Sequence, residues 1–493
     1  MSIRKLAGQT MVYGISSIVA RLLNYLLTPY LTRIMTEAEY GVVTDMYALI
    51  PFALVVLTMG LESGYFRFAG KAADGTEKRR VFSGVWGAVC VAAVLFMCIV
   101  LLFNNDLARV MGYADNPSFV WIVGAIITLD VVSAIPFARL REQGRAGRFV
   151  VVRVASVVIN LGLCLFFYSL LPRLAEGSAL FASIYDPSFG AGYVFVANLV
   201  ASAAALLMLL PTTGGAWPRI DRRTLRPIFL YSLPLLISGI AGTANEFIDR
   251  QMIKYLMPDD LAMSALGVYG AVVKIGVVLL LFTQMYRLAA EPFFLADFKK
   301  EDFVRTNAEA MKFFIIISIA IFLCITLFTD LFALIIGRDF RQGMYILPVV
   351  LVSNILSGVV LNLSFWYKQM GATRFAIVVT GTGLVFTVVF NILLVPRLGY
   401  YGAAIARLIC EAAMVAVSYI LNRRHCPTPY DLRRIGIYVL VGAALYGCGF
   451  VTAQLPVMWK YFCNLALLAA FCIFALRCEK IDLRALVRSV IKR

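Results

Sequence analysis

Long apolar runs, separated by short polar connections, fill nearly the whole chain. A run of about 18 or more residues with few charges is typical of a helix that crosses a membrane. Because hydrocarbon offers no hydrogen-bond partner, the backbone of each run must be satisfied within a helix. The pattern predicts about fourteen spans, near residues 9–32, 42–62, 81–103, 118–138, 149–171, 191–211, 227–249, 265–287, 311–336, 344–366, 375–395, 401–421, 435–454 and 457–476. We therefore expect an all-α integral membrane protein.

Composition agrees with this pattern and narrows the chemistry. Of the 493 residues, 61% are hydrophobic and 15% are charged, whereas soluble domains carry about 25% charged residues. The ten cysteines are scattered without a Cys-x-x-Cys pair, and His425 is the single histidine. A disulfide framework, a zinc site and acyl-transfer chemistry are therefore disfavoured, and no cofactor is predicted.

The basic residues alternate between connections and so predict the orientation. Lys and Arg accumulate on the cytoplasmic side of a membrane protein. Here they concentrate in the even-numbered connections, for example Lys78, Arg79 and Arg80 in the second and Arg139, Arg141, Arg145 and Arg148 in the fourth. We expect both termini in the cytoplasm, with the basic segment 479–493 lying on the cytoplasmic surface of the membrane. The net charge of +17 then borders an anionic leaflet, which argues against nucleic acid as a partner.

Two halves of the chain show internal similarity. The connections 141–149 and 368–375 resemble one another, and each leads into a helix with an asparagine in its second half, Asn160 or Asn391. We interpret helices 1–6 and 7–12 as two six-helix lobes in a parallel pseudo-repeat, followed by two further helices. Chance similarity among segments rich in glycine and alanine is the alternative.

The division predicted on this basis has four parts. They are an N-terminal lobe at 1–211, a cytoplasmic linker at 212–226, a C-terminal lobe at 227–421, and helices 13 and 14 with a basic cytoplasmic tail at 422–493. Two lobes of like orientation enclose a central cavity and allow alternating access by rocking.

Ionisable residues inside spans are candidates for the lining of that cavity, because an unpaired charge in the membrane is costly. Arg21 and Asn24 lie on a polar stripe of the first helix, and Lys274 lies in the middle of the eighth. Neither cation has a carboxylate at helical spacing on its own helix. Asp45, Glu62 or Asp130 could pair with them in a purely structural role; otherwise Arg21 and Lys274 face the cavity and hold a phosphate group.

Two further charged pairs complete the set of candidates. Glu246 and Arg250 are one turn apart near the end of helix 7, and so are Arg407 and Glu411 in helix 12. Each pair could be a structural ion pair within its helix. We keep Glu246, Arg250 and Arg407 with Arg21, Asn24 and Lys274 as candidate substrate-binding residues.

Several short motifs give the chain a family resemblance. They are Gly8-Gln9-Thr10, the segment 27–33 (LTPYLTR), Glu39-Tyr40-Gly41-Val42, Asp249-Arg250, Leu266-Gly267-Val268-Tyr269 with Lys274, Ala290-Glu291-Pro292-Phe293 and the segment 429–434 (PYDLRR). In order and spacing the chain resembles bacterial oligosaccharide flippases. These form the polysaccharide transporter family of the multidrug/oligosaccharidyl-lipid/polysaccharide exporter superfamily.

The resemblance implies passage of an undecaprenyl-diphosphate-linked oligosaccharide from the cytoplasmic to the periplasmic leaflet, with a cation-lined cavity. It also implies partners: the lipid-linked anionic glycan, membrane lipids, a coupling H⁺ or Na⁺, and the polymerase and glycosyltransferases of the pathway. The sugars could meet the amides Asn24, Asn354, Asn362 and Asn391. The alternatives are a lipid II flippase, a multidrug exporter of the superfamily, and a membrane glycan polymerase. An enzyme is disfavoured because the long extracytoplasmic loop and the acidic or histidine groups that it would need are missing.

Overall fold

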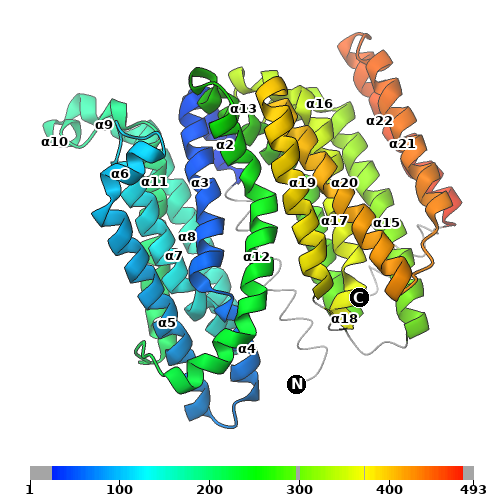
Figure 1. Cartoon of the computed structure of the whole chain (residues 1–493). Helices are drawn as coiled ribbons and strands as arrows, with labels where there is room; N and C mark the ends of the chain where they lie inside the picture. The colour runs from blue at the N-terminus through cyan, green and yellow to red at the C-terminus, as the bar shows by residue number, and fades with distance from the viewer. Residues whose placement is uncertain (1–24, 296–299, 371, 373, 481–493) are drawn as a thin grey trace. The chain divides into compact units, whose positions relative to one another are not determined.

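The computed structural model describes residues 25–295, 300–370, 372 and 374–480. Every regular element in that part of the chain is helical (Figure 1). The elements of the first half are α2 Leu27–Ile34, α3 Glu37–Thr58, α4 Leu61–Lys71, α5 Gly75–Leu102, α6 Asn104–Val110, α7 Ser118–Glu142, α8 Ala146–Leu165, η1 Phe166–Leu170, α9 Leu171–Gly177, α10 Ala179–Ala182, η2 Pro187–Phe189, α11 Gly192–Leu209 and η3 Leu210–Thr213. The elements of the second half are α12 Arg222–Leu256, α13 Asp259–Ile275, α14 Val277–Leu295, α15 Lys300–Leu327, α16 Thr329–Ala333, η4 Asp339–Ile346, α17 Leu347–Leu363, α18 Phe365–Gln369, α19 Arg374–Leu398, α20 Tyr400–His425, α21 Leu432–Thr452 and α22 Val457–Cys478.

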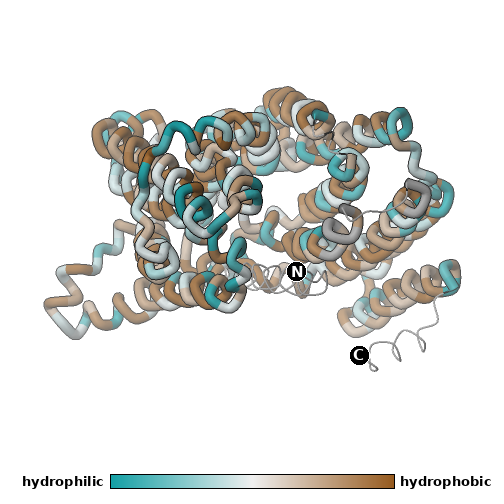
Figure 2. Tube along the Cα trace, turned by 90° about the horizontal axis from the view of Figure 1, so that it is seen from below, coloured by the Kyte–Doolittle hydropathy of each residue, from teal (hydrophilic) through white to brown (hydrophobic). Residues whose placement is uncertain are grey.

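The helices confirm the all-α membrane class. Within the described residues, 12 helices are long and apolar enough to span a membrane, or 13 when the pair α13 and α14, bent by 47°, counts as one span. Apolar stretches, coloured brown, recur along the helical tubes (Figure 2). The span predicted at 9–32 lies mostly outside the described residues, as do Arg21, Asn24 and most of the basic tail. Each of the other thirteen predicted spans coincides with a helix or with a run of adjoining helices.

The seventh predicted span is shorter than the helix that contains it. The apolar pattern ends the seventh span at residue 249, but α12 continues to Leu256. The charged residues in this extension break the hydropathy signal without breaking the helix. The helix instead ends at Leu256, because Pro258 disfavours a helical conformation of the preceding residue and Met257 is extended.

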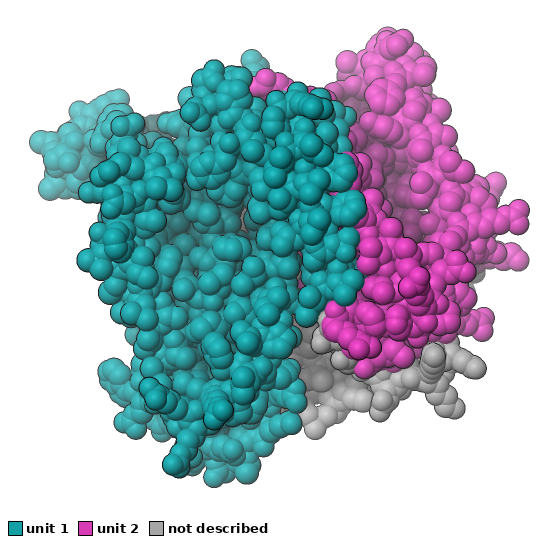
Figure 3. Space-filling view, in the orientation of Figure 1, with its two compact units in different colours: residues 1–274, 336–340, 376–406 teal, residues 275–335, 341–375, 407–493 magenta. Residues whose placement is uncertain are grey.

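The chain forms two compact units, which are described separately (Figure 3). Unit 1 comprises residues 1–274, 336–340 and 376–406, and unit 2 comprises residues 275–335, 341–375 and 407–493. These units do not follow the lobe boundaries expected from the internal repeat, and the division at 1–211 and 227–421 stays a prediction.

Within unit 1, α3 and α13 approach so closely that their backbones touch. A Cβ atom on Gly267 would lie 1.9 Å from the carbonyl oxygen of Glu37, and one on Gly41 would lie 2.0 Å from that of Met263. The side chain of Ser264 donates a hydrogen bond to Glu37 at the same crossing. Small residues permit such backbone contact between membrane helices, where van der Waals packing drives association. The glycines of the motifs at 39–42 and 266–269 are therefore explained by a helix crossing.

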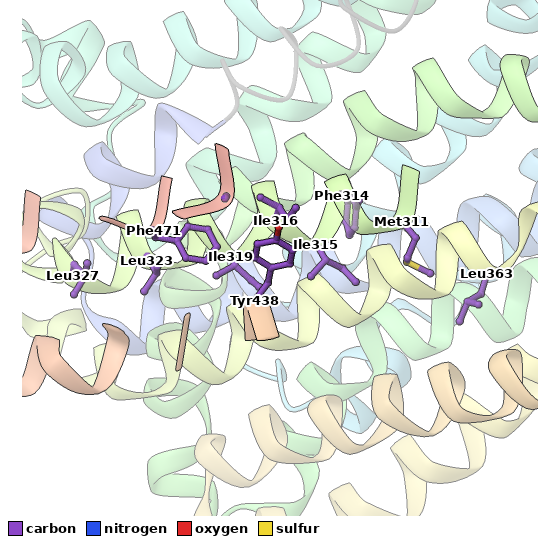
Figure 4. Packing of buried hydrophobic residues seen from close by; sticks show 11 residues of the cluster. Met311, Phe314, Ile315, Ile316, Ile319, Leu323, Leu327, Leu363, Tyr438 and Phe471 are labelled. Atoms are coloured by element: carbon purple, nitrogen blue, oxygen red, sulfur yellow. The ribbon is translucent and has the colours of Figure 1, made fainter. Parts of the chain in front are cut away.

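Unit 2 is organised around α15. Its apolar residues Phe314, Ile315, Ile319 and Leu323 pack with Tyr438 of α21 and Phe471 of α22, among other residues of one buried cluster (Figure 4). At the end of α22, Glu479 forms an ion pair with Lys312 of α15 and accepts a hydrogen bond from Tyr438 at 2.8 Å. Burial raises the pKa of Glu479, but the hydrogen bonds from Lys312 and Tyr438 and the neighbouring positive charges outweigh it, so this pKa lies below its usual value. The last two predicted helices, α21 and α22, are thus attached to α15 by a carboxylate as well as by apolar contacts.

The glycine crossing in unit 1 can be tested by adding one methyl group. Gly267→Ala places a Cβ against the Glu37 carbonyl, so we expect a loss of about 1–3 kcal/mol, as for other overpacked sites. The control is Gly242→Ala in α12, where a Cβ meets nothing within 4 Å and removal of a helical glycine adds up to about 1 kcal/mol. Thermal unfolding of the detergent-purified protein measures both. Equal melting temperatures for the two variants would contradict the backbone contact.

The anchor at Glu479 predicts a pH dependence. Because its pKa is lowered in the folded state, the stabilisation is complete above the usual pKa of a glutamate and is lost as the pH falls through the lowered value. We expect Glu479→Gln to lower the melting temperature at neutral pH and to reduce the further loss on acidification. Melting curves of both proteins at neutral and acidic pH give the comparison. An acid response that is unchanged in the variant would rule out this carboxylate as a source of the pH dependence.

Candidate transport site

A buried ion pair joins α3 to α12 in unit 1. Asp45 of α3 is 0% exposed, and its carboxylate pairs with the ammonium of Lys254, which is 6% exposed. Gln251 of α12 donates to Asp45 Oδ1 at 2.6 Å, and the hydroxyl of Tyr113 donates to Oδ2 at 2.5 Å. The Lys254 ammonium also lies 4.4 Å from the centre of the Tyr113 ring. Every oxygen of the buried carboxylate thus has a donor, as a charge removed from water requires.

Tyr113 is kept in its donor form by this environment. It lies in the segment between α6 and α7, outside the spans. Burial, followed by the charge of Asp45 and the hydrogen bond to it, raises the pKa of Tyr113 above its usual range. Its phenol therefore stays protonated and donates to Asp45 throughout the physiological pH range.

A second charged cluster lies on α12 and α13. Asp249, which is 2% exposed, accepts from the hydroxyl of Tyr269 in α13 and forms an ion pair with Arg250 at 3.0 Å. Arg250 also donates to the backbone carbonyl of Glu246 at 2.9 Å. The expected Glu246–Arg250 ion pair is therefore replaced by the Asp249–Arg250 pair, and the Glu246 side chain is exposed. The contact between Asp249 and Tyr269 also brings together two of the motifs behind the family resemblance.

Lys274 has a different kind of partner. It is half-buried at the C-terminal end of α13, where a cation also complements the helix dipole. Its ammonium donates to the hydroxyl of Tyr40 at 2.7 Å and lies 5.0 Å from the centre of that ring. Tyr40 is 0% exposed and packs edge-on against Phe340. A phenol satisfies one donor of the ammonium but leaves its positive charge uncompensated.

The three carboxylates considered as structural partners for Arg21 and Lys274 lie elsewhere. Asp45 pairs with Lys254, and Glu62 pairs with Arg141. Asp130 interacts with Ser202 and with the charge of Arg153. The purely structural explanation for Lys274 is therefore not supported, whereas Arg21 and Asn24 lie outside the described residues.

The remaining predicted residues are in the second half of the chain. Arg407 and Glu411 lie one turn apart on α20, and each is 8% exposed. Asn354, Asn362 and Asn391 are almost completely buried and donate to the Gly276 carbonyl, the Tyr286 hydroxyl and the Thr387 carbonyl. The Oδ1 atoms of the three amides have no hydrogen-bond partner among the described residues, and their contact with sugar stays a prediction. Asn354 satisfies a backbone carbonyl at the break between α13 and α14.

Sequence reasoning missed Lys254, Gln251 and Tyr113. The predicted seventh span ends at residue 249, so Lys254 falls outside it. The spacing of Glu246, Arg250 and Lys254 at intervals of four was the available signal, because it places all three on one face of a continuing helix. No metal-binding group of three or more His, Cys, Asp or Glu residues occurs in the described part of the chain.

Comparison with known proteins identifies a family for the chain and known structures with a similar fold. The family model described as "Polysaccharide biosynthesis protein" matches residues 6–295, more than half of the chain. The chain is 19% identical over 424 residues to "Probable low-salt glycan biosynthesis flippase Agl15" of Haloferax volcanii, covering 85% of this chain and 83% of that protein.

Two solved structures share the fold. Lipid II flippase MurJ in an inward closed conformation superposes with a TM-score of 0.74 at 10% identity, covering 96% of this chain and 100% of that chain. An inward-facing multidrug resistance MATE family transporter of the MOP superfamily gives a TM-score of 0.64 at 16% identity, covering 86% of this chain and 95% of that chain. At these identities the likeness concerns the fold alone.

The Asp45–Lys254 pair can be tested by a double-mutant cycle. Asp45→Asn and Lys254→Met each leave one buried charge alone, and we expect each to cost about 3–5 kcal/mol. The double variant Asp45→Asn/Lys254→Met removes both charges, so its loss should be smaller than the sum of the single losses. Thermal unfolding of the four purified proteins measures the coupling. Losses that simply add would show that the two side chains act independently.

Proposed function

Since the chain belongs to the polysaccharide biosynthesis protein family, we propose that it moves an undecaprenyl-diphosphate-linked oligosaccharide from the cytoplasmic to the periplasmic leaflet by alternating access. The relative of Haloferax volcanii, named as a glycan biosynthesis flippase, supports a glycan as cargo. The multi-pass membrane fold, shared with a lipid flippase and a transporter, supports transport. A location in the bacterial inner membrane belongs to the same proposal and is supported by the resemblance to bacterial oligosaccharide flippases. Cytoplasmic termini also belong to it and are supported by the basic connections.

The observation that carries the proposal is the pairing of Lys274. Among the described cations at this site, Lys254 and Arg250 each have a carboxylate partner, whereas Lys274 is held by the neutral hydroxyl of Tyr40. A positive charge without a counter-ion inside a span is expensive and indicates a role toward a ligand. An anionic ligand would supply the missing charge.

The chemistry of the cargo fits this cation. A diphosphate exposed to hydrocarbon faces a prohibitive desolvation cost. A fixed ammonium along its path lowers that barrier, because it replaces part of the hydration of the phosphate oxygens. The polyprenyl chain can remain in lipid during the passage. The fold likeness to MurJ and to a MATE transporter does not select among their different cargoes.

We assign the candidate residues on the same reasoning. Lys274 binds phosphate, and Arg21 assists it from the first helix. Arg250 and Arg407 supply further positive charge once the lobes move, while Asn24 and Glu246 offer polar contacts to the sugars. A proton or sodium gradient is the proposed energy source, and the polymerase and glycosyltransferases of the pathway are the proposed partners.

Lys274 can be tested in a strain that lacks the gene. Lys274→Met retains the length of the side chain and removes its charge, and loss of a charged hydrogen bond predicts export about 10- to 100-fold lower. Lys274→Arg retains the charge and should restore part of the export. Arg21→Ala is expected to reduce export in the same way. The measurement is surface glycan on complementation, with the amount of protein in the membrane measured in parallel.

Two matched variants control for charge and for folding. Lys71→Met removes an exposed cation at the end of α4 and should leave export unchanged. Tyr40→Phe removes the hydroxyl that accepts a hydrogen bond from Lys274 but leaves the charge of Lys274 in place. We expect this variant to retain most of the export activity. Full complementation by Lys274→Met at normal protein levels would refute the role of this cation.

A further inference from the structure

Unit 1 contains a charged pocket that is separate from the site around Lys274. Its volume is about 460 Å³, and the residues that matter for its chemistry are Tyr65, Lys78, Arg79, Arg139, Glu142 and Arg145. They come from α4, from the beginning of α5, from the end of α7 and from the residue before α8. These connections are among those that the positive-inside rule assigns to the cytoplasmic side.

The pocket carries an excess of positive charge. Four cations and one carboxylate line it, which leaves three positive charges uncompensated by its lining. The single ion pair in the lining is Lys78 with Glu142, at 3.0 Å. A concave surface with an excess of one sign concentrates counter-ions of the other sign.

Two of the arginines are held in place by backbone carbonyls, and neither forms an ion pair with the described residues. Arg79 donates to the carbonyl of Gly215 at 3.0 Å, and Arg139 donates to the carbonyl of Thr213. The accepting carbonyls lie at the end of η3 and in the turn that follows it. In this turn Gly214 and Gly215 have φ values of +57° and +67°, a left-handed conformation that favours glycine. The Arg139 guanidinium also lies 4.3 Å from the centre of the Phe82 ring. Because each arginine has five N–H donors, several remain for an additional acceptor.

Arg145 contributes a charge with no described function in the fold. Its side chain is exposed, and it makes no hydrogen bond or ion pair with the described residues. It lies immediately before α8 and lines the pocket together with Arg139. A cation in such a position can bind an anionic ligand without breaking an internal contact.

We propose that this pocket binds the phosphate group of a lipid in the cytoplasmic leaflet. Planar guanidinium groups match phosphate oxygens, and two of those in the pocket are already oriented by backbone carbonyls. The volume accommodates a headgroup rather than a whole lipid. The helix ends that form the pocket border the anionic leaflet, where lipid phosphate is the most abundant anion. The inference depends on the membrane orientation and does not require that the chain transport glycan.

Two double variants with equal charge change test the pocket. Arg79→Gln/Arg145→Gln removes two cations from the lining, whereas Arg80→Gln/Arg148→Gln removes two exposed cations from the same connections that do not line it. The full chain, purified in a non-ionic detergent, is titrated calorimetrically with dihexanoyl phosphatidylglycerol, farnesyl diphosphate, inorganic pyrophosphate and dihexanoyl phosphatidylcholine. We expect the pocket variant to bind the phosphate lipids about 30-fold more weakly, and the control variant to change by less than about threefold.

Further outcomes keep the test decisive if the double variant folds poorly. Arg145→Gln alone, which removes no described internal contact, should weaken binding about fivefold. Preference for farnesyl diphosphate assigns the site to a lipid carrier, and preference for phosphatidylglycerol assigns it to bulk phospholipid; either result supports the pocket. Pyrophosphate binding as tightly as both lipids, equal weakening in the two double variants, or no binding by the wild type would overturn it. Because binding is measured without transport, normal export by a protein that binds no phosphate lipid refutes only the pocket.

Discussion

A carboxylate buried without water must be surrounded by donors, and this requirement at Asp45 governs the arrangement of unit 1. Lys254 and Gln251 of α12 and Tyr113 of the segment after α6 all donate to it. The consequence is that α3 and α12 are held at one relative position along their length. With α3 fixed, its crossing with α13 through Gly41 and Gly267 places the ammonium of Lys274 against Tyr40. The positive charge proposed to meet the cargo thus depends on a negative charge that is fully satisfied.

The cations of unit 1 fall into two groups according to their partners. Lys254, Arg250 and Arg141 have carboxylates, so their charges are compensated within the protein. Lys274, Arg79 and Arg139 are held by a phenol or by backbone carbonyls, which fix the position of a cation and leave its charge available. In this conformation the distinction separates cations that already have a carboxylate partner from cations whose charge is available to an anion. The cations available to an anion lie in two regions: Lys274 lies within a span, and Arg79 and Arg139 lie at helix ends.

The sequence was sufficient for the fold class because the hydrocarbon interior imposes the same pattern on every span. Thirteen predicted spans match helices, and the polar stripe of the first falls outside the described residues. The failures concern partners, which depend on contacts between distant segments. Asp45 and Lys254 are separated by 209 residues, so no local spacing indicates their pairing. Arg250 forms its ion pair with the neighbouring residue Asp249. Rules that pair residues three or four positions apart on a helix do not predict a pair of sequence neighbours. Lys274 was identified because a lone cation inside an apolar span has no local explanation.

The most direct test of this account is translocation by the purified full-length protein in liposomes. Two cargoes with the same oligosaccharide and polyprenyl chain are compared, one joined through a diphosphate and one through a neutral linkage. The account predicts that the protein moves the diphosphate-linked glycan between leaflets and leaves the neutral one near the rate of protein-free liposomes. Equal rates for the two cargoes would contradict the claim that positive charge within the spans recognises the phosphate.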